Sequence, residues 1–424
     1  MTRKLITWPL LRTLGLYVGA CWVAVEFADW LVGRYSLPDR VVDFTLIGLL
    51  SFLPTVALLA RNHGEPGHQQ WTRTEKIFVP ANVVLTATVL GALLLSGPGS
   101  TRPEDAIPVR TVTVTEPSGE ALTRPLVPAA LSRGLTMFFF DNDTGDDALD
   151  WMQYGVTIAL HADVSQNPFI KPWSPLVGWE SYGMFKLRKA GFDEGLDVPV
   201  ALKRTIAADG LMEYFVGGRL ERASDGESIE LVTVLYDTSS SRVVRELRTD
   251  AGPAGVHLLN AIDTITTELT ASLDLPDNEG SVVDLPAADR LTNSLEAFEL
   301  HTHGAVAKLI DSDRDAAVEF WREAVTADPS FALAHLAMGQ SLFESGLMMD
   351  GGLAIQSALR HDYKLDDRER FIAKGMNYVF RGDRDKEAAT YATWTELKPN
   401  DPMAFIYLAS SQLYGQNDVS GALA

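Results

Sequence analysis

Residues 317–342 read AVEFWREAVTADPSFALAHLAMGQSL, and this stretch decides the fold of the C-terminal third. The second of two antiparallel helices in such a pair typically has small residues, one large aromatic residue and a proline at its end. This pattern is matched by Ala317, Ala324, Trp321 and Pro329. After the turn, Gly339 suits the first helix of a further pair, because a glycine lets two helices approach closely. The stretch therefore predicts stacked helix pairs.

The same pattern recurs toward the C-terminus. Equivalent positions are occupied by Leu342, Ile355, Ala358, Gly375, Tyr378, Tyr391 and Pro399. A spacing of roughly 34–36 residues is that of tetratricopeptide (TPR) repeats. Residues 290–424 are therefore predicted to form an α-helical TPR solenoid whose last repeat is incomplete. We expect the chain to be a fragment, or to cover that end with a second copy as a homo-oligomer.

Residues 1–97 contain three long apolar runs, at about 13–33, 41–60 and 77–96. Each has about the 20 residues that cross a bilayer, which predicts three transmembrane α-helices with the lipid bilayer as a partner. Lys and Arg are denser before the first run and between the last two than in the loop between the first two. This bias predicts a multi-pass membrane protein, with residues from 98 onward outside the cytoplasm.

Glu26 and Asp29 form an acidic pair on one face of the first predicted span. Ionisable groups at membrane depth are costly and often have a function. Two interpretations stay open. The pair takes part in helix–helix association, or it reaches the outer interface and only fixes the depth of the helix.

Residues 98–132 include six prolines among Ser, Thr and Glu, which predicts an extended Pro-rich linker. Residues 133–280 then alternate between strand and helix patterns. The apolar run 135–140 reads as a buried strand, and the turn-forming residues 141–145 end it. The order β-α-β-α-β-β-β-α predicts an α/β sandwich domain.

Three segments of this region carry a resemblance to a known family: TMFFFDN at 136–142, YFVGGRL at 214–220 and LVTVLYDT at 231–238. With ACWVAVEFADW at 20–30, they resemble the TolB-like N-terminal-type domain that bacterial membrane proteins place before TPR repeats. The first strand has Phe138 or Phe139 where the family usually has a proline. The resemblance implies scaffolding or signalling in the cell envelope, at the bacterial inner membrane, and carries no catalytic set.

Composition excludes several functions. A net charge of −20 argues against nucleic acid as a partner, because phosphate binding needs clustered Lys and Arg. The single cysteine, Cys21, cannot form an intrachain disulfide. The sequence has no GxGxxG, P-loop, HExxH or GxSxG motif, so we expect neither an enzyme nor a cofactor.

Two acidic loops and two histidines are the candidates for a metal site. The loop 141–147 is the best of them, but turn formation and helix capping explain it without a metal. The loop 311–315 reads as a solvated connection. His301 and His303 are two residues apart, so they point to different helix faces and are expected to be surface or packing residues. No metal is predicted.

The leading interpretation is a membrane-anchored envelope scaffold that binds a protein or peptide partner on the repeats and the α/β domain. The alternative is a membrane sensor or regulatory subunit of a signalling or transport complex, which would use the transmembrane region. An enzyme with its site in the α/β cleft rests on no motif.

Overall fold

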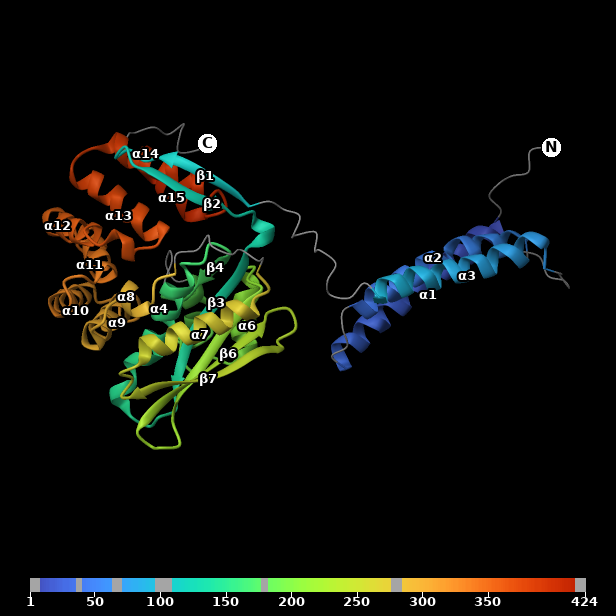
Figure 1. The fold of residues 1–424 in the computed structure, drawn as a ribbon, viewed down its shortest axis with the longest axis horizontal. Helices are drawn as coiled ribbons and strands as arrows, with labels where there is room; N and C mark the ends of the chain where they lie inside the picture. Colours follow the sequence, from blue (N-terminus) through green and yellow to red (C-terminus); the bar gives the residue numbers. More distant parts are fainter. Residues whose placement is uncertain are drawn as a thin grey trace. The chain divides into compact units, whose positions relative to one another are not determined.

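The computed structural model describes residues 8–35, 40–62, 71–95, 109–176, 182–275 and 284–415 (Figure 1). The chain divides into two compact units, Met1–Arg102 and Pro103–Ala424. Within the described ranges, the first unit is helical and the second contains two sheets and further helices.

The first unit is built from consecutive helices that each pack against the next: α1 (Trp8–Tyr35), α2 (Arg40–Asn62) and α3 (Arg73–Leu95). Hydrogen bonds join them. Tyr17 Oη donates to the α2 backbone at 2.6 Å, and Asn82 Nδ2 donates to Thr55 Oγ1 at 2.7 Å. The contacts between these helices are therefore partly polar, while large apolar side chains such as Trp22 and Ile77 are exposed.

The prediction of three transmembrane spans at 13–33, 41–60 and 77–96 is wrong. In the described part of the chain, no helix combines the length and the apolar character that crossing a membrane requires. Ionisable residues interrupt the helices: Glu26 and Asp29 lie within α1, and Glu75 lies in the first turn of α3. The predicted inner-membrane location, the bilayer as partner and the extracytoplasmic placement of residues from 98 onward all depended on those spans.

The larger sheet of the second unit has the strand order β4-β3-β5-β6-β7. Its strands are β3 (Arg133–Asn142), β4 (Ile170–Trp173), β5 (Tyr214–Arg222), β6 (Ser228–Asp237) and β7 (Val243–Pro253). β3 runs parallel to both of its neighbours, and β5, β6 and β7 are antiparallel. Residues 134–140 of β3 are all buried, as expected of a central strand that is covered on both faces.

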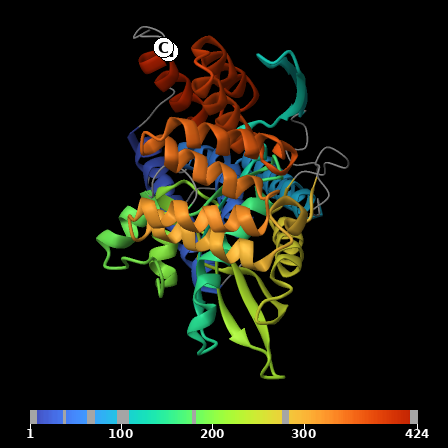
Figure 2. The ribbon, with the colours of Figure 1, turned by 90° about the vertical axis from the view of Figure 1, so that its left-hand side faces the viewer.

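Helices cover the sheet: α4 (Trp151–Val164), α5 (Tyr182–Lys189), α6 (Val200–Asp209) and α7 (Leu258–Ser272). α4 and α7 pack together against one face, and α6 packs against β5 from the other (Figures 1 and 2). Every residue of α4 is buried, because this helix also contacts the first helix of the repeat region.

The remaining helices follow in the chain, and from α9 onward each contacts the next. They are α8 (Ala287–Arg290), α9 (Leu295–Leu309), α10 (Arg314–Ala327), α11 (Ala332–Glu344), α12 (Met348–Leu359), α13 (Asp367–Phe380), α14 (Arg384–Leu397), α15 (Pro402–Ser410) and the π-helical turn η5 (Ser411–Gly415). The side chains of Asp313, Asp366 and Asp383 cap the starts of α10, α13 and α14. Each cap accepts a backbone N–H that the helix leaves unpaired.

The core of the sheet continues into the helix pairs without a break. Trp151 of α4 and Phe298 of α9 meet edge to face, with ring centroids 6.0 Å apart. One buried apolar cluster runs from β3 through α4 and on to Trp321 of α10. The predicted regions 133–280 and 290–424 therefore share a core.

The predicted Pro-rich linker, 98–132, differs from the structure over its described part. β1 (Arg110–Thr115) and β2 (Ala121–Leu126) form an antiparallel hairpin. Val114 and Leu122 of this hairpin are buried in one apolar cluster with Trp394 of α14. The alternating apolar residues give the hairpin one buried face, and Pro125 is tolerated because β2 is an edge strand.

Candidate functional site

A cavity of about 620 Å³ lies where three parts of the second unit meet. The hairpin contributes the end of β2, the α/β region contributes residues 165–172, which run from the end of α4 into β4, and the helix pairs contribute the start of α13 and the loop after α14. Arg290, the last residue of the short helix α8, closes one side. The cavity is therefore built from segments that are far apart in sequence.

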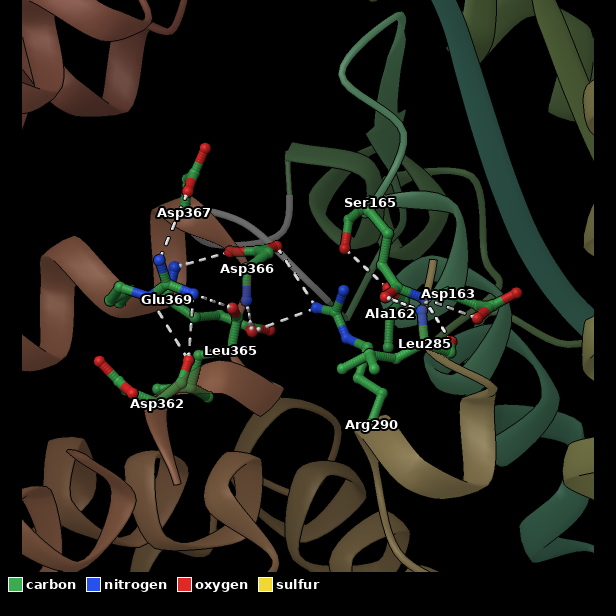
Figure 3. A network of polar contacts seen from close by, with 12 residues as sticks. Ala162, Asp163, Ser165, Leu285, Arg290, Asp362, Leu365, Asp366, Asp367 and Glu369 are labelled. Atoms are coloured by element: carbon green, nitrogen blue, oxygen red, sulfur yellow. Dashed lines mark hydrogen bonds and ion pairs between the residues drawn. The ribbon is translucent and has the colours of Figure 1, made fainter. Parts of the chain in front are cut away.

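Arg290 is the most deeply placed cation of this cavity, with a side chain that is 4% exposed. Figure 3 shows its guanidinium pointing toward two carboxylates at the start of α13. Arg290 Nη2 lies 3.2 Å from Glu369 Oε2 and 3.7 Å from Asp366 Oδ2. A buried arginine needs such partners, because an unpaired buried charge is strongly destabilising.

The same two carboxylates form a capping box. Glu369 N donates to Asp366 Oδ1 at 2.7 Å, and Asp366 N donates to Glu369 Oε2 at 2.8 Å. Asp366 and Glu369 thus begin α13 and also bind Arg290 (Figure 3). This double use ties the start of α13 to α8.

Burial and nearby charges shift the pKa values of Asp366 and Glu369 in opposite directions. Burial and the carboxylate of Asp366 raise the pKa of Glu369 to about 7. Burial alone would raise the pKa of Asp366 as well, but Arg290 and the hydrogen bond from Glu369 N together outweigh burial and lower it. Asp366 is therefore ionised beside Arg290 near pH 7, whereas Glu369 becomes ionised only as the pH rises through about 7.

His161, near the end of α4, also lines the cavity, and it is 7% exposed. Burial lowers the pKa of His161 to about 3, although the carboxylate of Asp366 acts in the opposite direction. Its imidazole is therefore neutral near pH 7. Among the residues that the structure describes, no hydrogen bond to this imidazole is found.

Three basic side chains lie within 4.0 Å of the carboxylate of Asp367. Its carboxylate lies 2.9 Å from Arg124 Nε of β2, 3.8 Å from Lys398 Nζ and 4.0 Å from Arg370 Nη1. These cations come from the hairpin, from the loop after α14 and from α13 itself. Asp367 therefore links the hairpin to the helix pairs.

A second polar network holds the segment before α8 against α4. Gln166 Nε2 donates to Asp163 Oδ1 at 3.0 Å and to the carbonyl of Leu285 at 2.9 Å, while Leu285 N donates back to Gln166 Oε1. Thr266 of α7 donates to the other oxygen of Asp163. Burial raises the pKa of Asp163 to about 6. Arg290 lies at the end of the short helix that follows Leu285.

Most residues predicted from the repeat pattern lie between helices and do not line this cavity. Buried in the helix interfaces are Ala317, Trp321, Ala324, Gly339, Leu342, Ile355, Ala358, Gly375 and Tyr391. Tyr378 is half-buried beneath Lys386 Nζ, Pro329 is exposed, and Pro399 lines the cavity. The pattern thus marks packing positions.

The structure describes the side chain of only one member of the predicted acidic pair. Glu26 is exposed on α1, and the side chain of Asp29 lies outside the described residues. The interpretation of the pair as intramembrane groups falls with the transmembrane spans.

Among the metal candidates, Asp141 has a hydrogen-bond partner and His301 has an aromatic neighbour. Asp141 Oδ1 accepts the backbone N–H of Asp197 at 3.0 Å. His301 is buried against Phe331, with ring centroids 4.9 Å apart, and burial lowers its pKa to about 4. In the described ranges, no group of three or more His, Cys, Asp and Glu is arranged to hold a metal ion.

The cavity residues were missed from the sequence: His161, Arg290, Asp366, Asp367 and Glu369. One local signal was available, since Asp366 and Glu369 have the spacing of a capping box. Nothing local points to His161 or Arg290, because their surroundings come from distant segments.

Comparison with known proteins gives no family assignment. No protein-family model matches the chain. No curated protein matches it either. The resemblance to TolB-like domains before TPR repeats therefore stays a prediction.

Proposed function

We propose that the protein is a non-enzymatic scaffold whose helix pairs bind a segment of a partner protein. The observation that carries the proposal is a second cavity, of about 280 Å³, within the array of helices. It lies among α11, α13, α14, α15 and η5, and apolar and aromatic side chains dominate its wall: Phe343, Met376, Val379, Tyr391, Tyr407 and Tyr414.

A cavity of this size and character suits one large apolar side chain of a bound segment. Buried aromatic and aliphatic anchors supply most of the binding energy of protein interfaces. Arg384 and Glu387 form an ion pair at 2.8 Å at the edge of the cavity, where polar groups can orient a bound backbone. Stacked helix pairs provide extended surfaces for such segments.

The buried carboxylates of the larger cavity support the non-enzymatic part of the proposal. Asp366 and Glu369 cap α13 and bind Arg290. A catalytic base needs an acceptor that can reach a substrate, whereas these oxygens already accept protein hydrogen bonds.

Site-specific photo-crosslinking of the full chain in cells tests the scaffold proposal. A photo-reactive residue in place of Tyr414, which is 80% exposed beside the apolar cavity, should give a defined adduct with a partner. The same residue in place of Leu211, which is 89% exposed on the α/β region, is the matched control and should not give that adduct.

The crosslinked segment, made as a synthetic peptide, should bind the purified chain. Val379→Asp places a charge in the apolar wall and should weaken binding at least about 10-fold, whereas Leu211→Asp should not. Identical adducts at both crosslinking positions, or equal binding by the two aspartate variants, would contradict the proposal.

A further inference from the structure

The larger cavity has an excess of positive charge that its own carboxylates do not balance. Seven basic residues line it: Arg124, Lys171, Arg290, Lys364, Arg368, Arg370 and Lys398. Four acidic residues face them: Asp366, Asp367, Glu369 and Asp401. In a chain with a net charge of −20, a local excess of cations is a specific feature.

The ion pairs show where the excess lies. Arg290 is matched by Asp366 and Glu369, and Arg368 is matched by Asp401 at 3.0 Å. Lys364 donates to Ser330 Oγ at 3.1 Å, and Asp367 faces three of the remaining cations. One carboxylate thus stands against Arg124, Arg370 and Lys398.

Lys171 adds a further positive charge at the mouth of the cavity. It follows the first residue of β4, its side chain is exposed, and no ion pair to it is found in the described part of the chain. Its ammonium group is therefore available to a ligand.

His161 is the second, independent sign of a ligand. It is more than nine-tenths buried, it lines the cavity, and its imidazole lacks a hydrogen-bond partner within the described ranges. An imidazole that lines a cavity and has no protein partner there can form a hydrogen bond with a bound ligand. A neutral imidazole can donate one hydrogen bond to an anionic oxygen.

We propose that this cavity binds a small organic anion that carries phosphate or carboxylate groups. The anion would occupy the space between Lys171, Lys398 and His161, where its charge offsets the excess of cations. The volume of about 620 Å³ falls in the range typical of small-molecule sites. This site is separate from the apolar cavity of the proposed function, so each proposal can fail without the other.

Calorimetric titration of the full chain with ADP, inorganic pyrophosphate and citrate tests this proposal. We expect at least one of the three to bind with a Kd below about 1 mM at 0.15 M salt, a concentration that screens exposed charges beyond about 8 Å. Binding of ADP or pyrophosphate without citrate would identify a phosphate ligand, and the reverse result a carboxylate ligand.

Charge reversals locate the site. Lys171→Glu and Lys398→Glu should each raise the Kd at least about 10-fold, a change of about 1.4 kcal/mol. Lys189→Glu, at an exposed position of α5 outside the cavity, makes the same change in net charge and should leave the Kd within about two-fold.

Two outcomes would overturn the anion site. The first is that none of the three anions binds. The second is that Lys189→Glu weakens binding as much as Lys171→Glu, which would show only general attraction of charge. Because no ion pair of Lys171 is found among the described residues, thermal melting of Lys171→Glu should match that of the unaltered chain, which separates lost binding from lost folding.

Discussion

Gly339 of α11 lies so close to Ile355 of α12 that a Cβ atom on the glycine would stand 2.7 Å from Ile355 Cδ1 and 3.2 Å from the carbonyl of Gly351. Real Cβ atoms do not come within 3.0 Å of a neighbour, so a larger residue here would have to displace Ile355 or separate the two helices. Gly304 faces Trp321 and Gly375 faces Tyr391 in the same way. The three helix pairs therefore share one packing rule.

Gly339→Ala should lower the free energy of unfolding by about 1–3 kcal/mol, because the added methyl group must push α11 and α12 apart. Urea denaturation followed by circular dichroism measures this change. Gly210→Ala is the control, since its Cβ would meet nothing closer than 3.5 Å and should change stability by no more than about 0.5 kcal/mol. Equal losses from the two variants would show that the glycine contact has no special weight.

Arg290→Ala should cost about 3–5 kcal/mol, because it leaves two buried carboxylates without their cation. The loss should grow as the pH rises through 7, where Glu369 becomes charged beside Asp366. Arg314→Ala breaks an exposed ion pair with Glu344 and should cost no more than about 1 kcal/mol. Chemical denaturation at pH 6 and pH 8 distinguishes these expectations, and an equal cost for both arginines would refute the role of Arg290.

His161 should make the protein sensitive to acid. Its pKa is about 3 in the folded chain and about 6.5 when unfolded, so the unfolded state binds more protons between these values. The stability that comes from the neutral imidazole is present above pH 6.5 and is lost as the pH falls toward 3. The slope approaches about 1.4 kcal/mol per pH unit.

Replacement of this imidazole should flatten the acid limb of the stability curve. His161→Gln should reduce the loss of stability between pH 6.5 and pH 4, as measured by denaturation at each pH. His303→Gln, at a position of α9 that is 41% exposed, controls for the loss of an imidazole as such. Parallel curves for the unaltered chain and His161→Gln would contradict the assignment.

Leu122→Asp should release the hairpin from the helix pairs. The side chain is buried with Trp394, and a charge there has no partner within the apolar cluster. Limited proteolysis should then cut between residues 109 and 127 sooner than in the unaltered chain. Thr111→Asp, on the exposed side of β1, should leave the rate of cutting unchanged. If both variants are cut at the same rate, the buried face does not hold the hairpin.

Local patterns in the sequence carry much of this architecture. β3 lies on the apolar run that begins at Leu135, and Gly339 and Ile355 belong to neighbouring helices whose spacing is readable in the chain. The hairpin was harder to predict, because Pro117 and Pro125 suggest an extended linker and the apolar alternation at Val114 and Leu122 is short.

Features that depend on several distant segments could not be predicted. The cavity brings together Arg124, His161, Arg290 and Lys398, and no local spacing relates them. The prediction of transmembrane spans was wrong for a different reason. The apolar runs were given more weight than the ionisable groups inside them, such as Glu26 of α1, and polar contacts such as that of Asn82 with Thr55 are not visible in the sequence.

The contact between Trp151 and Phe298 has a consequence for how this chain can be divided. A cut in the connection between α7 and α8 would leave each half with a bare aromatic ring and part of a shared interior. We therefore expect recombination to fail at this junction: neither half should be transferable to another host protein as an independent building block. A recombinant protein would have to contain both the sheet and the first helix pair.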